Sequence, residues 1–230
     1  MATAENHLIE LLPRKDRLRL LALCEPVQLV LAEVLCEHGQ STSYLYFPVD
    51  GVISLVAQID GHPALEVGMV GREGMLGAQL VLGVDTAPLD ALVQGPGLAW
   101  RIGTADFSSE LARSPELQKS LNRYLSVLME QFAVASACLR FHMIVPRLAR
   151  WLLMSQDRAH SDTFHVTHAF LAGMLGVRRV GITSAAGSLQ RRGLIEYHRG
   201  ELTVLDRPGL EAAACNCYAA DRKAYADLLN

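Results

Sequence analysis

The chain has 230 residues, of which 50% are apolar, and its net charge at neutral pH is −3. This length fits one large domain or two smaller ones with a proper hydrophobic core. No apolar run reaches the roughly 18 residues that a membrane-spanning helix requires, and the N-terminus lacks the basic start and long apolar stretch of a signal peptide. We therefore expect a cytoplasmic protein without membrane contact.

The first half of the chain has turn residues at the spacing that is typical of a β-domain. From about residue 20 to 108, glycines separate short apolar or alternating runs at intervals of roughly ten to twelve residues. Short strands at this spacing predict an antiparallel sandwich or barrel, and Asp60-Gly61 is a good two-residue hairpin turn. We expect a β-roll here, preceded by a helix from Leu8 to Leu23.

From about residue 115 to 141 the apolar period becomes helical, at steps of three or four. Such a helix outruns one small sheet, which favours pairing with a second copy of itself. The alternative is packing within its own subunit. The residues predicted to form the dimer seam are Leu121, Leu128, Phe132, Ala135 and Leu139. Pro146 cannot lie deep inside a helix, so a hinge is expected at Phe141 to Ile144.

The remaining chain has the order of a winged helix-turn-helix. A helix follows Pro146, and a polar break at His160 to Asp162 precedes the stretch GMLGVRRVGITSAAGSLQRRGLI, residues 173 to 195. A tight hairpin turning at Arg199-Gly200 comes next, and an amphipathic helix from Pro208 to Leu229 ends the chain.

Two short helices in this region predict a DNA-binding unit. Thr167 suits the N-cap of the first helix, and Gly176 supplies the positive φ of a sharp turn between the helices. The second helix, about 178–191, has an apolar face of Ile182, Ala185, Ala186 and Leu189 at helical spacing. Its opposite face carries Arg178, Arg179, Val180, Thr183, Ser184 and Ser188. Short side chains behind long donors are what a helix in the major groove needs.

The residues of this face receive different roles. We expect Arg179 to contact guanine, Val180 to touch a thymine methyl and Ser184 to bond a base edge. We expect Gly181 to let the α-helical backbone at this position come close to the DNA backbone. Contacts to phosphates, which fix register without reading sequence, are assigned to Arg178, Thr167 and the wing residue Arg199.

The charge distribution agrees with this division. Between residues 140 and 210 there are ten arginines and five acidic residues, so the remainder of the chain carries the net negative charge. A basic back half fits a phosphate-binding module, although a solvated charged surface gives the same count.

Five cysteines, an odd number, indicate a reducing compartment rather than a disulfide framework. Cys215-Asn216-Cys217 suggests metal or redox chemistry, but a C-x-C without a nearby histidine is more often a pair of helix-packing thiols. We therefore predict no metal site and no cofactor. The sequence also lacks the H-E-x-x-H, phosphate-loop and G-x-S-x-G motifs, so we predict no enzymatic activity.

In RLARWLL, FLAGMLGVRR and SLQRRGLI, and in the order of its parts, the chain resembles the Crp/Fnr family of bacterial transcription regulators. The resemblance implies an α+β fold: a cyclic-nucleotide-binding-like β-roll (1–113), a dimerisation helix and hinge (114–144), and a winged helix-turn-helix domain (145–230). It also implies a homodimer on a two-fold symmetric DNA operator, control by a signal in the roll, and RNA polymerase as a further partner.

The effector pocket implied by the family falls on Gly71, Arg72, Glu73, Gly74 and Met75. In members that bind cyclic AMP, a glutamate holds the ribose and an arginine holds the phosphate. Here Arg72 replaces that glutamate, and Leu89 and Asp90 offer no cation, so cyclic AMP is not expected. Cys24 and Cys36 are too few for an iron–sulfur cluster. Haem binding through His38 or His62 stays open.

A second hypothesis comes from another class of protein. The chain would be a small-molecule-binding regulatory module whose helical tail recruits a protein partner rather than DNA. It predicts that Arg179→Ala leaves function intact, whereas DNA reading predicts a loss of about 1 to 3 kcal/mol of binding free energy.

Overall fold

The computed structural model describes residues 6–229 of the chain. It begins with two short helices, α1 (His7–Glu10) and α2 (Arg14–Ala22), where the sequence predicted one. Pro13 separates them because its ring excludes it from a helix interior. The Asn6 side chain caps α1 by accepting from the Ile9 N–H, and Leu20 of α2 is buried.

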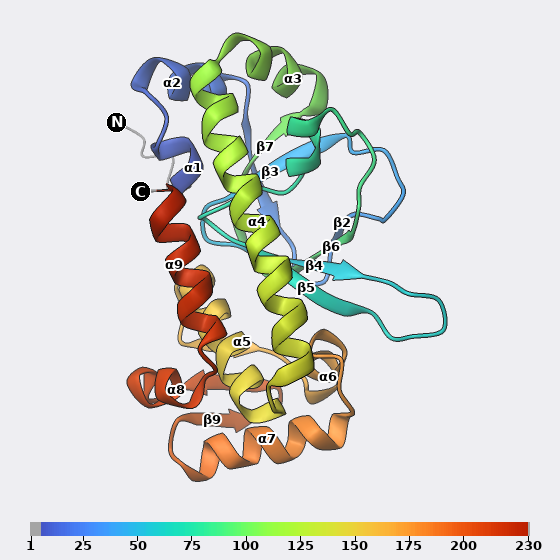
Figure 1. The fold of residues 1–230 in the computed structure, drawn as a ribbon, viewed down its shortest axis with the longest axis vertical. Helices are drawn as coiled ribbons and strands as arrows, with labels where there is room; N and C mark the ends of the chain where they lie inside the picture. Colours follow the sequence, from blue (N-terminus) through green and yellow to red (C-terminus); the bar gives the residue numbers. More distant parts are fainter. Residues whose placement is uncertain (1–5, 230) are drawn as a thin grey trace.

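Two antiparallel sheets form the predicted β-roll (Figure 1). One sheet has the order β1 (Glu25–Leu29), β7 (Gly97–Gly103), β3 (Tyr44–Pro48), and the other has β2 (Val34–Cys36), β6 (Asp90–Gly95), β4 (Val52–Ala57), β5 (Leu65–Val70). Between β4 and β5, Gly61 has the positive φ expected of the predicted turn, in a loop that is longer than two residues. Apolar side chains fill the roll, among them Leu29, Ile53, Val70, Val93 and Ala99.

The 3-10 helix η1 (Ala78–Leu82) and helix α3 (Thr104–Arg113) lead to the long helix α4 (Pro115–Phe141), which has the predicted bounds. Ser114 caps α4 by accepting from the Leu117 N–H, and Pro115 occupies its first turn. The helix ends at the predicted hinge, and Phe141 and Met143 are exposed there.

The prediction that Leu121, Leu128 and Phe132 of α4 form a dimer seam is wrong. Leu121 and Leu128 are buried within the subunit, in one cluster with Phe47 and Phe107 of the roll side, and Phe132 packs against that cluster. Ala135 and Leu139 face a small cavity in front of β5 and helix α5 (Ile144–Ala159). The apolar stripe therefore covers the subunit's own roll and α5, where its burial already removes it from water.

The C-terminal region continues with β8 (Thr163–His165), α6 (His168–Met174), α7 (Arg179–Arg191), β9 (Ile195–His198), β10 (Glu201–Val204) and α8 (Arg207–Ala213). The three strands form one sheet in the order β8-β10-β9. The strand β8 was not predicted from the sequence. The core of this region contains Leu152, Leu171, Ile182, Leu189 and Leu210, each with no exposed surface.

The predicted terminal helix is two helices, because the chain leaves helical geometry after Ala213 and α9 (Cys217–Leu229) starts in a new direction. Helix α9 runs back beside α4 toward α1 (Figure 1), and Gln131 Nε2 of α4 donates to the Tyr225 hydroxyl at 2.8 Å. The predicted unit 145–230 thus contains a helix that lies largely outside its core. Among the described helices, none is long and apolar enough to cross a membrane.

Candidate nucleic-acid interface

The predicted turn between two helices is present in α6 and α7. Thr167 Oγ1 accepts from the Phe170 N–H at 3.1 Å and caps α6. Gly176 has φ of 60°, so this position takes the left-handed conformation that favours glycine. The Val177 N–H donates to Ala172 O at 2.9 Å, which closes the turn and starts α7 after Arg178.

The inward face of α7 is the one predicted. Ile182 and Leu189 have no exposed surface and Ala185 and Ala186 are 2% exposed. A Cβ at Gly181 would lie 2.8 Å from Ile144 Cδ1, at the start of α5. The approach of α5 is therefore a packing reason for a small residue at Gly181 that does not depend on DNA contact.

The outward face of α7 is open to solvent. Arg178, Arg179, Val180, Thr183 and Ser184 are exposed, and Ser188 is half-buried. Val180 is 72% exposed, so its two methyl groups are free to touch another surface. Such a residue at the tip of a basic helix fits contact with a partner surface.

The sequence analysis missed His168 of α6, which contacts the exposed face of α7. His168 Nδ1 lies 3.0 Å from Thr183 Oγ1, and the His168 ring stacks on Tyr197 of the wing with ring centroids 4.5 Å apart. Burial, with Arg179 nearby, lowers the pKa of His168. Thr183 is thus engaged inside the motif, since its hydroxyl also donates to Arg179 O.

The wing is the hairpin of β9 and β10. Arg199 and Gly200 at its turn have φ of 50° and 89°, the two positive values of a type I′ turn. Arg199 is exposed. The wing therefore presents a cation on a short, rigid hairpin beside α7.

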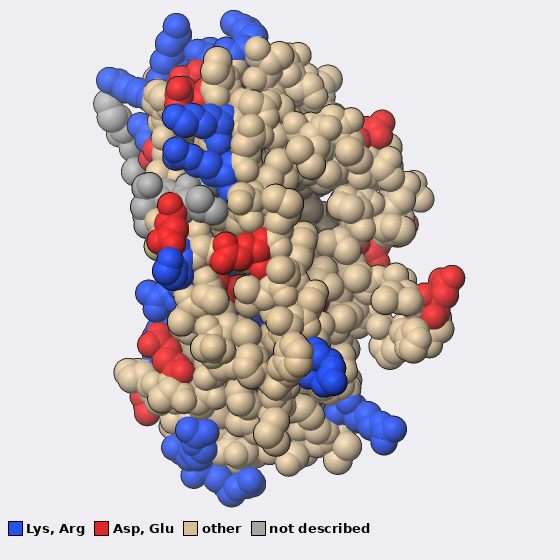
Figure 2. Space-filling model, in the orientation of Figure 1, with Lys and Arg blue, Asp and Glu red and all other residues tan. Residues whose placement is uncertain are grey.

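The ten arginines between residues 140 and 210 fall into two groups. Four act inside the subunit: Arg147 donates to Leu175 O, and Arg150, Arg158 and Arg207 pair with Asp221, Glu73 and Asp157. The other six are exposed: Arg140, Arg178, Arg179, Arg191, Arg192 and Arg199. Figure 2 shows basic side chains at the end of the molecule formed by α7 and also at the opposite end, around α2 and α3. Exposed arginines are therefore present where DNA binding was predicted, but positive charge is not confined to that end.

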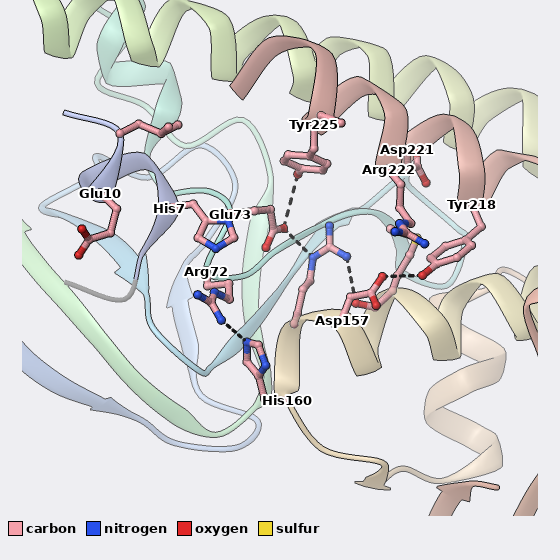
Figure 3. Close-up of a pocket in the computed structure, with 14 residues that line it drawn as sticks. His7, Glu10, Arg72, Glu73, Asp157, His160, Tyr218, Asp221, Arg222 and Tyr225 are labelled. Atoms are coloured by element: carbon pink, nitrogen blue, oxygen red, sulfur yellow. Dashed lines mark hydrogen bonds and ion pairs between the residues drawn. The ribbon is translucent and has the colours of Figure 1, made fainter. Parts of the chain in front are cut away.

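Two of the five predicted effector residues line a pocket. Arg72 and Glu73 border a cavity of about 560 Å³ between the roll, α5 and α9 (Figure 3). Arg158 Nε lies 2.7 Å from Glu73 Oε1, and the Arg72 guanidinium lies 2.9 Å from His160 Nε2. The segment that follows β5 is therefore bound to α5, the first helix of the DNA-binding domain, and to His160 at the end of that helix.

The other three residues serve packing, which corrects that part of the prediction. A Cβ on Gly74 would overlap the phenol of Tyr124, and the Tyr124 hydroxyl donates to Met75 O at 3.2 Å. Met75 is 1% exposed, and a Cβ on Gly71 would meet Arg158. These residues fit the roll to α4 and α5.

An exposed basic helix after a tight turn, with a wing beside it, defines a winged helix-turn-helix DNA-binding protein. Residues 146–213 match the family model described as the Crp-like helix-turn-helix domain. No curated protein matches the chain.

Solved structures show the same fold over most of the chain. The c-di-GMP-responsive global regulator CLP of Xanthomonas campestris is 17% identical, covering 84% of this chain and 99% of that one, with a TM-score of 0.67. FixK2 of Bradyrhizobium japonicum is 12% identical over 84% and 98%, with a TM-score of 0.69. A CRP/FNR-family transcriptional regulator of Thermus thermophilus is 24% identical over 83% and 98%, with a TM-score of 0.66.

These findings confirm the resemblance seen in the sequence. Residues 146–213 form a Crp-like helix-turn-helix domain, and the chain as a whole has the fold of the CRP/FNR transcription regulators.

Proposed function

We propose that two copies of this chain bind a two-fold symmetric operator, each with α7 in a major groove, and that the protein acts by binding rather than catalysis. The observation that carries this proposal is the division of α7 into a fully buried face and an exposed basic face. The two-fold symmetry implies a palindromic site, and half-sites about one helical turn apart are the usual spacing for helix-turn-helix dimers.

The exposure of this face supports the following contacts. We assign Arg179 and Ser184 to base edges and Val180 to a thymine methyl, since all three side chains are exposed. Arg178, Thr167 and Arg199 hold phosphates. Thr183 takes a positioning role instead, because its hydroxyl contacts His168. Ser188, further along the helix and half-buried, is left at the rim of the contact.

Because the predicted seam is buried within the subunit, we propose a different face of α4 for the dimer contact. Exposed residues follow one another at alternate steps of four and three, the spacing of a and d positions in a coiled coil: Asn122, Ser126, Met129, Ala133 and Ser136. Met129 is 65% exposed, and the small side chains around it permit close approach of a second helix. This stripe supports a parallel pairing of two α4 helices.

Signal control is proposed to pass through Glu73. A ligand or partner that reaches this carboxylate competes with Arg158 of α5, so it changes how the roll holds the DNA-binding domain. The same pairing supports the expectation that cyclic AMP is not the effector, since Glu73 is already engaged. Contact with RNA polymerase is proposed on the family resemblance alone.

The experiment is selection of bound duplexes from a random library, followed by fluorescence anisotropy with the enriched site. We expect a palindromic site whose affinity falls steeply with salt, and a loss of affinity in Arg179→Ala. Arg113→Ala, a change of an exposed arginine on α3 at the far end of the roll, is the matched control and should bind normally. Failure to enrich any site would contradict the proposal.

A further inference from the structure

Four side chains with metal-binding atoms meet at the hinge. Cys138 lies in the last turn of α4 and His142 follows the helix. Cys215 lies in the link from α8 to α9, and Cys217 is the first residue of α9. Their ligand atoms all lie within 4.8 Å of one another. The nearby histidine that the sequence alone did not provide for the C-x-C pair is thus supplied by the fold.

The distances match a metal-binding set. Cys138 Sγ and Cys215 Sγ are 3.6 Å apart, and Cys217 Sγ and His142 Nδ1 are 3.5 Å apart. Around a tetrahedral Zn²⁺ with Zn–S of about 2.3 Å and Zn–N of about 2.0 Å, neighbouring sulfurs are about 3.8 Å apart and sulfur and nitrogen about 3.5 Å apart. Two of the six pairs thus have the spacing of ligands on one ion, and the remaining pairs lie within 4.8 Å.

We propose that Cys138, His142, Cys215 and Cys217 form a site for a single zinc ion that fixes the hinge between α4 and the DNA-binding domain. Three thiolates and an imidazole are a donor set of structural zinc sites, and soft sulfur ligands disfavour magnesium and calcium. A cluster of two or more irons would spread its ligands further, because its ligand pairs belong to different metal atoms.

The surroundings suit such a site. The three cysteines are buried and Val134 packs against them, so the ion would be shielded from water. Zn²⁺ with three thiolates carries one net negative charge. Arg147 and Arg150 of α5 lie within electrostatic reach of Cys138, and they border the same small cavity. Arg150 also pairs with Asp221, so the compensating positive charge comes mainly from Arg147.

The position gives the ion a mechanical role. Its ligands join the end of α4, the residue that leads into α5, and the start of α9. Without the ion only hydrogen bonds and packing hold these three segments. The ion would fix the direction in which α5, and with it α7, leaves the dimer helix. Loss of zinc is therefore expected to weaken operator binding without changing the residues that touch DNA.

Metal content tests the proposal directly and needs no DNA. The full-length protein, purified under reducing conditions and dialysed, should contain about one zinc ion per chain by elemental mass spectrometry. Cys215→Ser and His142→Ala should lose most of it. Cys36→Ser, a change of a cysteine in the roll, is the matched control and should keep it. Replacement by Co²⁺ should give the intense visible bands of a tetrahedral thiolate site in the wild type and the control.

Two results would overturn the proposal. One is protein that contains no metal, shows five free thiols when a sample is denatured, and takes up neither Zn²⁺ nor Co²⁺ when folded. The other is a Cys138–Cys215 disulfide in protein isolated under non-reducing conditions, with no metal bound after reduction. Because the wild-type measurement stands alone, a variant that fails to fold does not obscure the outcome. Zinc content and operator binding are read separately, so either proposal can fail without the other.

Discussion

Trp151 Nε1 of α5 donates a hydrogen bond to Glu66 Oε1 of β5 at 2.9 Å. This bond belongs to a buried network that joins the roll to the DNA-binding domain. The Ser54 hydroxyl donates to the other oxygen of Glu66, and Gln94 Nε2 donates to Ser155 Oγ of α5 at 2.8 Å. The roll and α5 are thus linked by directed polar contacts as well as by apolar packing.

Glu66 makes folding stability depend on pH. Burial raises the pKa of Glu66 from 4.5 to about 7, against the opposing effects of Ser54, Trp151 and the more distant Arg158 and Arg150. Because the folded state prefers the protonated acid, its stabilising contribution is complete below pH 4.5 and is lost as the pH rises through about 7.

The change Glu66→Gln removes this titration and keeps the hydrogen-bonding shape. The wild type should therefore lose roughly 3 kcal/mol of unfolding free energy relative to the variant between pH 4.5 and pH 8. Urea unfolding of both proteins at several pH values measures the difference. A constant difference across this range would show that Glu66 does not titrate as stated.

The pair between Glu73 and Arg158 should matter for stability. Both side chains are largely buried, at 15% and 6% exposed, so Glu73→Gln leaves a buried guanidinium without its counter-charge. We expect a loss of about 3 kcal/mol in unfolding free energy. The matched control is Glu25→Gln, which breaks a far more exposed pair with Arg101 and should cost less than about 1 kcal/mol. Equal losses in both variants would contradict this reasoning.

The two faces of α7 should respond differently to truncation. Ile182 has no exposed surface, so Ile182→Ala should lower the unfolding free energy by about 3 kcal/mol. Val180→Ala should leave stability within about 0.5 kcal/mol and weaken operator binding. Thermal unfolding and anisotropy of the two variants separate these effects. A stable Ile182→Ala protein would mean that α7 is not docked as described.

The exposed stripe of α4 predicts the effect of a single charge. Met129→Glu places like charges opposite each other in a paired helix, so the dimer should dissociate to monomers in sedimentation velocity. Ser108→Glu, an exposed position on α3, should remain dimeric. Dissociation by Leu128→Ala with retention of the dimer in Met129→Glu would instead restore the seam expected from the sequence.

The period of α4 was readable from the sequence, but its partner was not. Apolar residues at helical spacing predict that one face of a helix is buried, but not against what. Leu121 and Leu128 are buried against the subunit's own roll. The stripe proposed for the dimer contains Met129 among small and polar residues, so its composition does not distinguish it from an ordinary exposed helix face. The local motif was predicted better, since Thr167, Gly176 and Ile182 depend mainly on neighbours in sequence.

Long-range pairings were beyond the sequence for a related reason. Cys138 and His142 are separated from Cys215 and Cys217 by more than seventy residues, and only the course of α9 along α4 brings them together. The same holds for Glu73 and Arg158, whose contact depends on how the roll sits on α5. One sequence by itself does not show which residues far apart in the chain come into contact.

Two chains are proposed to read one symmetric operator with their α7 helices. Titration of the selected palindrome, followed by native mass spectrometry and anisotropy, tests it most directly. We predict two chains per duplex, and a loss of about 1 to 3 kcal/mol per half-site in Arg179→Ala with relaxed preference at one base pair. One chain per duplex, or unchanged affinity and preference in Arg179→Ala, would contradict the account.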